Sequence, residues 1–151
     1  MKDEITWVIE GHLARSSRPG WWGERDLKLV IPDWIERVRQ MGVRSIVCLL
    51  NDAELDRFYG RQGIHLLQHY EAAGFRVARV PVPDHEEPPM TEDELQRLCE
   101  ALGKLPAPWL IHCSAGIDRT GCAVEFLHDK QGALDARSHI RQSANPMNPN
   151  F

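Results

Sequence analysis

Hydrophobic positions along the chain follow two different periods, which indicates strands that alternate with helices. Short apolar runs typical of buried strands occupy residues 44–50 and 109–113, and residues 75–82 alternate between apolar and polar like a further strand. Before and between these runs, apolar residues recur at helical spacing over residues 27–38 and again over residues 95–102. The pattern therefore predicts strand and helix in repeated succession along most of the chain.

Local signals mark where several elements begin. Two short apolar or alternating runs on either side of Gly11 predict a hairpin of two strands. Pro32 lacks a backbone N–H and breaks or kinks a helix interior, so we expect the first helix to begin near this residue. Thr91 is followed three residues later by Glu94, which forms a capping box and predicts the start of a further helix.

Glycine and polar residues divide the remaining helical stretches. Residues 53–74 are predicted to form one or two helical pieces that separate near residues 60–63. After the strand at residues 109–113, we expect one helix at residues 119–129. A last helix is predicted at residues 134–143, followed by a polar tail.

These elements predict an α/β fold with a central, mostly parallel sheet of four to five strands flanked by helices on both faces. The chain has 151 residues, of which 42% are hydrophobic and 26% are charged. This is long enough for one domain with a core and short for two, so we expect a single domain over residues 1–151. In such sheets, ligands bind beyond the carboxyl ends of the strands.

Charge and cysteine usage argue against several classes of function. A net charge of −4 disfavours a nucleic-acid-binding surface, which needs clustered Lys and Arg. No apolar stretch has the length of a signal peptide or a membrane span, so we expect a cytoplasmic protein without a membrane span. The four cysteines, Cys48, Cys99, Cys113 and Cys122, lack the paired spacing of a zinc site and the pattern of a disulfide framework. We therefore expect reduced thiols, no bound metal and no cofactor.

The stretch LIHCSAGIDRTGCA joins the last predicted strand to the helix after it, and it carries the candidate chemistry. Ser114, Ala115 and Gly116 are small, so the backbone can curl tightly and direct successive N–H groups into one concavity that binds an anion. The amino end of the following helix adds unpaired N–H groups to the same place. Cys113 facing such a cage ionises readily to the nucleophilic thiolate. Arg119 supplies a bidentate fork for two oxygens of a phosphate.

The segment HCSAGIDRTG, with Cys113, five intervening residues and Arg119, resembles the signature loop of the cysteine-based protein tyrosine phosphatase superfamily, and within it the small dual-specificity phosphatases. The stretch RVPVPDHEEPP is similar to the part of that family that carries the general acid, and Asp84 matches the acid. The resemblance implies a dual-specificity phosphatase-like fold and a phosphomonoester hydrolase that acts through a phosphocysteine intermediate. It also implies that the phosphoryl oxygens are bound by Arg119 and by the backbone of Ser114, Ala115, Gly116, Ile117 and Asp118.

The chemistry of phosphoryl transfer gives each candidate residue a role. Attack of the Cys113 thiolate on phosphorus expels an alkoxide or phenoxide, and Asp84 protonates that oxygen as the general acid. The Asp84 carboxylate then activates the water that cleaves the phosphocysteine. Glu86 or Glu87 are the substitutes for Asp84 as the general acid. Thr120 is expected to donate its hydroxyl to the sulfur. Covalent catalysis in two such steps needs no metal.

Phosphotyrosine in proteins is the predicted substrate, with phosphoserine and phosphothreonine as further targets, and three alternatives stay open. A phosphoinositide or small-metabolite phosphatase is the first, although the loop carries Ser114 and Ile117 where basic residues would help. Asp118 stands where the dual-specificity enzymes usually have glycine, so a catalytically weak phosphate-binding module is the second. A sulfurtransferase is the third, but it would leave the segment around Asp84 unexplained.

Four further residues have two interpretations each. Cys122 is interpreted as a packing residue, with a resolving thiol for an oxidised Cys113 as the alternative. Cys48 is interpreted as a small buried apolar residue unless the fold brings it close to Cys113. We interpret Arg15 and Arg18 as surface arginines. The resemblance to phosphatases whose RS segment approaches the pocket rim implies the alternative, contact with a second negative charge on the substrate.

Overall fold

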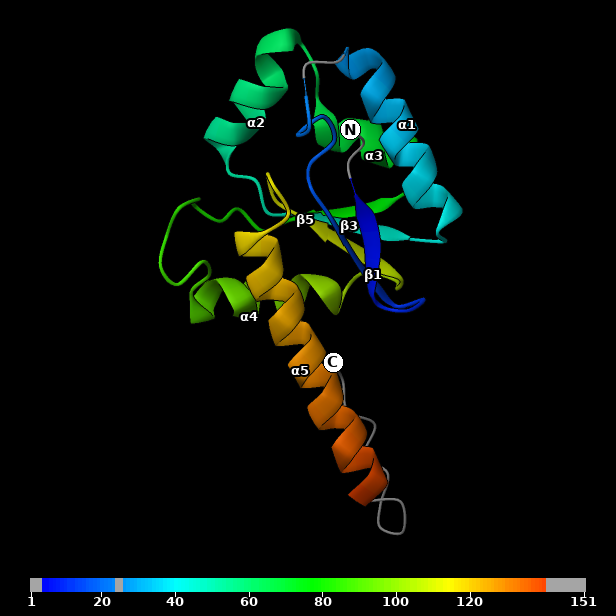
Figure 1. Ribbon diagram of the computed structural model, residues 1–151, viewed down its shortest axis with the longest axis vertical. Helices are drawn as coiled ribbons and strands as arrows, with labels where there is room; N and C mark the ends of the chain where they lie inside the picture. Colours follow the sequence, from blue (N-terminus) through cyan, green and yellow to red (C-terminus); the bar gives the residue numbers. More distant parts are fainter. Residues whose placement is uncertain (1–3, 24–25, 141–151) are drawn as a thin grey trace.

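The structure, a computed structural model, describes residues 4–23 and 26–140 (Figure 1). In these residues, five strands form one sheet in the order β1-β2-β5-β3-β4. The strands are β1 (Ile5–Ile9), β2 (Leu13–Ser16), β3 (Ser45–Cys48), β4 (Arg76–Arg79) and β5 (Trp109–His112). β1 and β2 pair antiparallel as the predicted hairpin, while β2, β5, β3 and β4 run parallel to one another. The predicted α/β fold with a mostly parallel sheet is confirmed.

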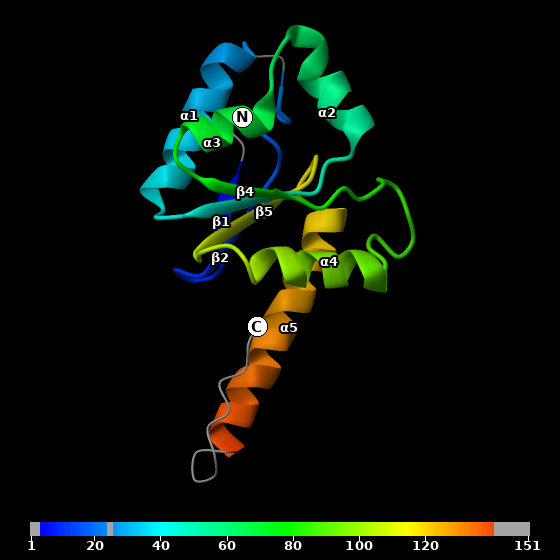
Figure 2. The same cartoon turned by 180° about the vertical axis from the view of Figure 1, so that it is seen from behind.

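Helices cover both faces of this sheet, as Figure 1 and Figure 2 show from opposite sides. The helices are α1 (Leu27–Gln40), α2 (Asp52–Phe58), α3 (Leu66–Ala72), α4 (Glu92–Leu102) and α5 (Asp118–Ile140), and a short 3-10 helix spans Gly60–Gln62. α1, α2 and α3 lie on one face of the sheet, and α4 and α5 lie on the other. Among the described residues, no helix is long and apolar enough to cross a membrane.

Each face of the sheet buries its own hydrophobic core, because successive residues of a strand point to opposite sides. In β3, Ile46 belongs to the core under α1 and α3, while its neighbour Val47 belongs to the core under α4 and α5. In β5, Leu110 and Ile111 divide between the two cores in the same way. Burial on both sides fixes the register of the central strands, and with it the residues that stand at their carboxyl ends.

The first helix begins earlier than Pro32 predicts. α1 begins at Leu27, and the Asp26 side chain caps it by accepting a hydrogen bond from the backbone N–H of Lys28 at 2.9 Å. Pro32 therefore lies inside the helix, where its missing N–H removes one backbone hydrogen bond. Burial of the apolar face of α1 offsets this loss, since Trp34 is fully buried against the sheet.

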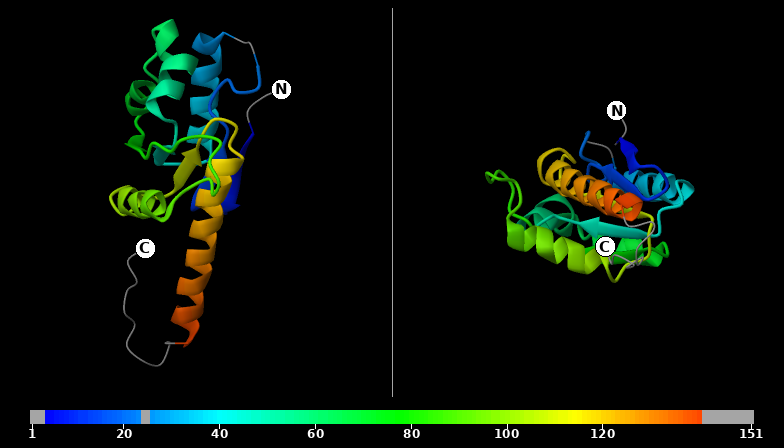
Figure 3. Two further views of the ribbon diagram at one scale, coloured as in Figure 1. Left: turned by 90° about the vertical axis from the view of Figure 1, so that its left-hand side faces the viewer. Right: turned by 90° about the horizontal axis from the view of Figure 1, so that it is seen from below.

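The predicted break between the last two helices is wrong. α5 is one continuous helix, whereas the sequence predicts separate helices at residues 119–129 and 134–143. Gly132 lies between the two predicted helices, but one glycine in a helix interior costs only about 1 kcal/mol and does not have to end the helix. Residues 141–143 lie outside the described residues. Figure 3 shows the second half of α5 extending beyond the sheet and α4.

Candidate active site

Four residues that are far apart in the sequence come to the carboxyl edge of the sheet. β2, β5, β3 and β4 run parallel, so the segments that follow them leave the sheet at the same edge. Arg18 follows β2, Cys113 follows β5, and Glu54 lies on α2 just after β3. Asp84 lies in the segment between β4 and α4. The strand order therefore explains why these side chains gather in one place.

The Cys113 loop, residues 113–118, is anchored to the sheet through His112. The backbone N–H of Leu49 donates to the carbonyl of His112 at 2.9 Å. The imidazole Nδ1 lies 2.9 Å from the carbonyl oxygen of Cys113, and Nε2 lies 2.9 Å from the hydroxyl of Tyr70. Burial lowers the pKa of His112 to about 4, so the ring is neutral at physiological pH. Because a carbonyl oxygen only accepts, Nδ1 donates to Cys113 and Nε2 accepts from Tyr70.

Two carbonyl groups of the Cys113 loop are bound by residues of the β2 side. The Ser114 carbonyl accepts a hydrogen bond from the backbone N–H of Arg18 at 2.8 Å, and the Gly116 carbonyl accepts one from Arg15 Nη2 at 2.6 Å. Gly116 has a φ of 76°, and a Cβ at this position would lie 2.6 Å from the carbonyl oxygen of Ser16. Glycine is therefore the residue that this close approach requires.

The backbone N–H groups of the same loop are available for hydrogen bonds. In the described part of the chain, no protein group accepts a hydrogen bond from the N–H groups of residues 114–117. α5 begins at Asp118, so the positive end of its dipole lies at the end of the loop. Cys113, at the start of the loop, is only 2% exposed. Successive free N–H groups beside a helix amino terminus form an arrangement that binds anions.

Arg119 is held by a carboxylate that the sequence did not reveal. Its Nη1 and Nη2 atoms donate to the two carboxylate oxygens of Glu54 at 2.7 and 2.8 Å. Nη1 also donates to the carbonyl of Val82 at 2.9 Å. Both Arg119 and Glu54 are buried. The bidentate pair therefore fixes the guanidinium in one orientation, with the Nη1 side occupied by the protein.

The Nε side of the same guanidinium is not saturated. Nε of Arg119 is buried and has no hydrogen-bond partner in the described residues. Nη2 has two N–H groups, of which one donates to Glu54, and the atom also lies 3.4 Å from Asp84 Oδ2. The edge formed by Nε and Nη2 therefore has the donors for two oxygens of one phosphoryl group.

The charges at this edge of the sheet stabilise one another. Burial alone would raise the pKa of Glu54 and lower the pKa of Arg119. The hydrogen bonds and opposite charges of the pair outweigh burial, so the pKa of Glu54 is lowered and that of Arg119 is raised. The nearby groups of Cys113 and Asp84 raise the pKa of Arg119 further. Arg119 therefore remains a cation beside the Cys113 loop.

The acid loop, residues 80–91, contributes one carboxylate to this group. Asp84 Oδ2 lies 3.4 Å from Arg119 Nη2, and the Asp84 side chain is 29% exposed. Asp84 Oδ1 accepts a hydrogen bond from the backbone N–H of the next residue at 2.9 Å, which orients the carboxylate. Glu86 and Glu87 are exposed, and within the described ranges neither forms an ion pair. The structure thus brings Asp84, and not its two predicted substitutes, into contact with Arg119.

Thr120 does not make the predicted hydrogen bond to the sulfur of Cys113 in this structure. Its side chain is fully buried on the first turn of α5. The hydroxyl oxygen has no hydrogen-bond partner among residues 4–23 and 26–130, whose side chains the structure describes. The Thr120 hydroxyl is therefore a free donor at the start of the helix. Leaving a buried hydroxyl without a partner costs about 1 to 3 kcal/mol of stability.

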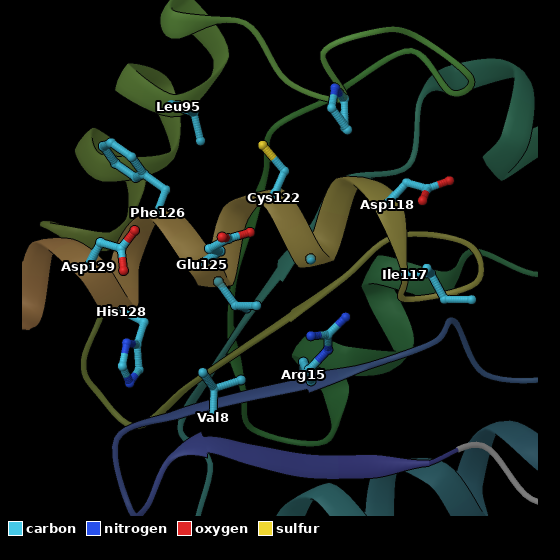
Figure 4. Close-up of a pocket in the computed structure, with 13 residues that line it drawn as sticks. Val8, Arg15, Leu95, Ile117, Asp118, Cys122, Glu125, Phe126, His128 and Asp129 are labelled. Carbon is cyan, nitrogen blue, oxygen red and sulfur yellow. The ribbon is translucent and has the colours of Figure 1, made fainter.

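The last two residues of the Cys113 loop turn their side chains to solvent. Ile117 is 60% exposed, and Asp118 is exposed as well. Figure 4 shows both at one end of a groove of about 780 Å³ that runs along α5. The Asp118 carboxylate therefore faces solvent. The alternative of a catalytically weak phosphate-binding module stays a prediction.

The thiols other than Cys113 have packing positions. Cys122 lines the groove along α5 and points to the side where Leu95 of α4 lies (Figure 4). Burial raises the pKa of Cys122, and it raises the pKa of the fully buried Cys48 to about 12. Cys99 is half-buried against the core under α4 and α5. The fully buried Cys48 agrees with the interpretation as a packing residue, although Cys48 lies close enough to Cys113 for the two thiols to interact electrostatically. Cys122 is half-buried, so the alternative of a resolving thiol stays open for it.

Arg15 and Arg18 are not ordinary surface arginines, so that interpretation is wrong. Both are half-buried and both bind the Cys113 loop. Besides its backbone contact, Arg18 donates from Nε to the Ser114 hydroxyl oxygen at 3.2 Å. The reason is the pairing of β2 with β5, which lays residues 15–18 along the start of the loop. This pairing joins strands from opposite ends of the chain and leaves no trace in the local sequence pattern.

Glu54 is the functional residue that sequence reasoning missed. One signal was available, because Asn51 followed three residues later by Glu54 has the spacing of a capping box. The structure contains that box, with the backbone N–H of Asn51 donating to Glu54 Oε1 at 3.1 Å. The signal predicts a helix start and nothing more. The contact with Arg119 spans 65 residues and depends on the fold.

Comparisons with known protein families and sequences bear on this site. A family model described as "Polymorphic toxin system, DSP-PTPase phosphatase" matches residues 25–131. The matched range includes Glu54, Asp84, Cys113 and Arg119. A search of the curated proteins gives no match.

Three solved structures show the same fold. The kinase-associated phosphatase, with serine in place of its catalytic-site cysteine, is 19% identical with a TM-score of 0.62, over 92% of this chain and 84% of that chain. The core catalytic domain of the PP-IP phosphatase SIW14 from S. cerevisiae is 21% identical with a TM-score of 0.58, over 97% and 79%. A mutant form of Tk-PTP is 25% identical with a TM-score of 0.53, over 95% and 83%. The chain is similar to phosphatases along nearly its whole length.

Proposed function

Because the chain belongs to the DSP-PTPase phosphatase family of polymorphic toxin systems, within the cysteine-based protein tyrosine phosphatase superfamily, we propose that it hydrolyses phosphomonoesters through a phosphocysteine on Cys113. In the first step, the Cys113 thiolate forms a bond to phosphorus and the bond from phosphorus to the leaving oxygen breaks. In the second step, a water oxygen attacks the same phosphorus and the S–P bond breaks. Inorganic phosphate leaves and the thiolate is regenerated.

The observation that carries this proposal is the state of the Arg119 guanidinium. Glu54 binds one side of it, while Nε is buried without a partner beside a loop of free N–H groups. Two oxygens of a phosphoryl group fit the Nε and Nη2 edge, and the third faces the backbone of residues 114–118. These donors are fixed before the substrate arrives, so they stabilise the charge that develops on the phosphoryl oxygens without reorganisation.

Asp84 moves the protons in both steps of the proposed reaction. Its carboxylic acid gives a proton to the leaving oxygen as that oxygen separates from phosphorus. Its carboxylate then takes a proton from the attacking water. The contact between Asp84 and Arg119 supports this role, because it holds the carboxylate at the guanidinium that binds the phosphoryl group. Thr120, with its free buried hydroxyl near the loop, is proposed to donate to the sulfur once the thiolate forms.

We propose phosphotyrosine in proteins as the substrate, with phosphoserine and phosphothreonine as further targets. The fold shared with the kinase-associated phosphatase and Tk-PTP supports this assignment. A small phosphomonoester is the second candidate, because the fold is equally shared with a PP-IP phosphatase. Initial rates on tyrosine-phosphorylated and serine-phosphorylated peptides, measured beside inositol phosphates, decide between them. Faster turnover of the peptides supports the first candidate, and faster turnover of the inositol phosphates overturns it.

Hydrolysis of 4-nitrophenyl phosphate in the presence of a metal chelator tests the proposed chemistry. We expect steady turnover by the wild-type protein and a loss of about 10⁴-fold or more in Cys113→Ser, because a serine hydroxyl is a poor nucleophile without an adjacent base. Cys122→Ser is the matched control, since it makes the same change at a half-buried thiol on α5, outside the Cys113 loop. Turnover that survives in Cys113→Ser would overturn the proposal.

A further inference from the structure

The groove along α5 begins at the two loops of the candidate active site (Figure 4). Ile117 and Asp118 of the Cys113 loop lie at one end, and Pro89 of the acid loop also lines the groove. From this end the groove follows α5 past Leu95 of α4 as far as Asp129. A molecule whose phosphate lies at the Cys113 loop can therefore continue into the groove.

Large apolar side chains are exposed in this groove. Four large apolar residues are exposed among the side chains that the structure describes, and two of them, Ile117 and Phe126, line the groove. Ile117 is 60% exposed and Phe126 is 36% exposed. Val8 and Leu95 add apolar surface that is only partly buried. Apolar side chains that gather in one hollow at the surface mark a site of interaction, whereas single exposed ones do not.

Three carboxylates follow the same groove. Asp118, Glu125 and Asp129 are seven and four residues apart, so they lie on one face of α5. All three are exposed, and none of them forms an ion pair with a Lys or Arg of the described residues. Arg15 is the one Lys or Arg that lines the groove, and its Nη2 donates to the Gly116 carbonyl at 2.6 Å. The groove therefore combines apolar surface with an excess of negative charge.

The length of the groove suits a short piece of extended chain. From Asp118 to Asp129, α5 rises by roughly 16 Å at about 1.5 Å per residue. An extended peptide covers this length with about five residues, because it rises about 3.3 Å per residue. When its phosphorylated residue lies at the Cys113 loop, the next five or so residues on one side of it lie along the carboxylates.

We infer that the groove along α5 binds a basic and apolar segment of a protein substrate, next to the phosphorylated residue. The inference rests on the proposed function and deepens it by defining the kind of protein segment that the enzyme selects. Lysine and arginine complement the carboxylates of Asp118, Glu125 and Asp129, while an apolar side chain covers Ile117 and Phe126. A segment rich in Asp and Glu is repelled by the same carboxylates and by the net charge of −4.

Pairs of tyrosine-phosphorylated peptides test this inference. The peptides of a pair share their length and apolar residues, and they carry either lysine or glutamate within five positions of the phosphotyrosine. We expect kcat/KM to be about ten times higher for the lysine peptide at low salt, and the ratio should fall as ionic strength rises because the carboxylates are exposed. The preference should hold for one side of the phosphotyrosine only, since the groove leaves the Cys113 loop in one direction.

Substitution of Glu125 separates the groove from a general effect of charge. Glu125→Lys should bring the ratio close to one and leave the turnover of 4-nitrophenyl phosphate within about twofold of the wild type. Glu71→Lys is the matched control, because it makes the same change at an exposed glutamate of α3, on the other face of the sheet. Phe126→Ala should lower kcat/KM for the lysine peptide but not for 4-nitrophenyl phosphate. An equal fall of the ratio in Glu71→Lys would overturn the inference.

Two further outcomes would also overturn it. A ratio close to one, or no turnover of either peptide, in a protein that hydrolyses 4-nitrophenyl phosphate would do so and would leave the proposed function intact. The second outcome is a dimer of the wild type in sedimentation velocity that Glu125→Lys dissociates, together with a ratio of one. The groove would then be an interface between two copies of the chain.

Discussion

The Cys113 loop and the acid loop both follow parallel strands and both reach Arg119, yet the protein holds them differently. Cys113 is 2% exposed, and its loop is bound through His112, Arg15 and Arg18. Asp84 is 29% exposed, and its contact with Arg119 is a single one at 3.4 Å. The side of the site that we propose binds phosphate is therefore buried and fixed, whereas the side that we propose faces the leaving group is open.

This difference fits the two tasks of a phosphatase. The phosphoryl group is the same in every substrate, so fixed donors around it lower the barrier for all substrates alike. The leaving groups differ in size and acidity, so an exposed carboxylate can reach several of them. The account therefore predicts large, substrate-dependent effects from changes in the acid loop and smaller, substrate-independent ones from changes behind the Cys113 loop.

Among the substitutions that test this comparison, Asp84→Asn has the largest expected effect. We expect kcat/KM to fall by about 10² to 10³-fold for alkyl and phenyl phosphates, because a general acid contributes about that much when the leaving oxygen is basic. The loss should be about tenfold for 4-nitrophenyl phosphate, whose leaving group is already acidic. Steady-state kinetics across a series of leaving groups measures the trend.

The control for Asp84→Asn is Glu86→Gln, which changes an exposed carboxylate of the same loop. We expect kcat within about twofold of the wild type for every substrate. An equal loss of kcat/KM in Asp84→Asn across all leaving groups would show that Asp84 supports the loop and does not protonate the leaving oxygen.

Glu54→Gln tests the other side of the site, where Arg119 lies beside the Cys113 loop. The substitution leaves the shape of the side chain but removes the charge that holds Arg119, so we expect kcat/KM to fall by about ten- to 100-fold for all leaving groups alike. Stability should fall by roughly 3 kcal/mol, because the buried Arg119 loses its counter-ion. Inhibition by inorganic phosphate should weaken in parallel, which a purely structural role would not require. Kinetics and urea unfolding of the same samples measure all three.

Asp52→Asn is the matched control for Glu54→Gln, since Asp52 lies on the same helix and pairs with Arg79 at the surface. Its side chain is 92% exposed, so we expect a change in stability below about 1 kcal/mol. Unchanged phosphate inhibition in a folded Glu54→Gln protein would contradict the assigned role of Glu54.

The smallest expected effect concerns the pH dependence of stability. Burial lowers the pKa of His112 from 6.5 to about 4, so between these values the unfolded chain binds a proton that the folded protein does not. His112 therefore lowers the free energy of unfolding progressively as the pH falls from 6.5 towards 4. The pKa of Glu54 is lowered in the folded protein, so the contribution of Glu54 to the free energy of unfolding is lost as the pH falls below the ordinary value of 4.5. We expect His112→Gln to show a shallower decline than the wild type between pH 6.5 and 4.5 in urea unfolding.

The control for this titration is His69→Gln, which changes an exposed histidine on α3 and should keep the slope of the wild type. Equal slopes for the wild type and His112→Gln would mean that His112 is protonated in the folded protein. Nε2 of His112 would then carry a proton and could not accept the hydrogen bond from the Tyr70 hydroxyl.

What the sequence predicted correctly is what short stretches of chain determine. The hairpin at Gly11, the capping box at Thr91 and the strand before Cys113 each depend on neighbouring residues, and the structure contains all three. The loop that carries both Cys113 and Arg119 is likewise continuous in the sequence, so a short stretch was enough to single it out as a candidate site. The assignment of roles to these residues remains a prediction until the variants are measured.

What the sequence could not predict depends on contacts between distant segments. Glu54 already had a local explanation as a capping residue, so nothing in its surroundings pointed to Arg119. Pro32 was expected to mark a helix start, but burial of the helix against the sheet outweighs its local effect. In each case a tertiary contact, and not a propensity, decided the outcome.

Trapping of the covalent intermediate tests the central claim most directly. Asp84→Asn should still transfer the phosphoryl group from 4-nitrophenyl phosphate to the enzyme, but it should release that group slowly because the water is no longer activated. Acid quenching followed by mass spectrometry of the digested protein should then find one phosphoryl group on the peptide that contains Cys113. A phosphoryl group on any other residue, or continued turnover with no modified Cys113 peptide, would contradict the account.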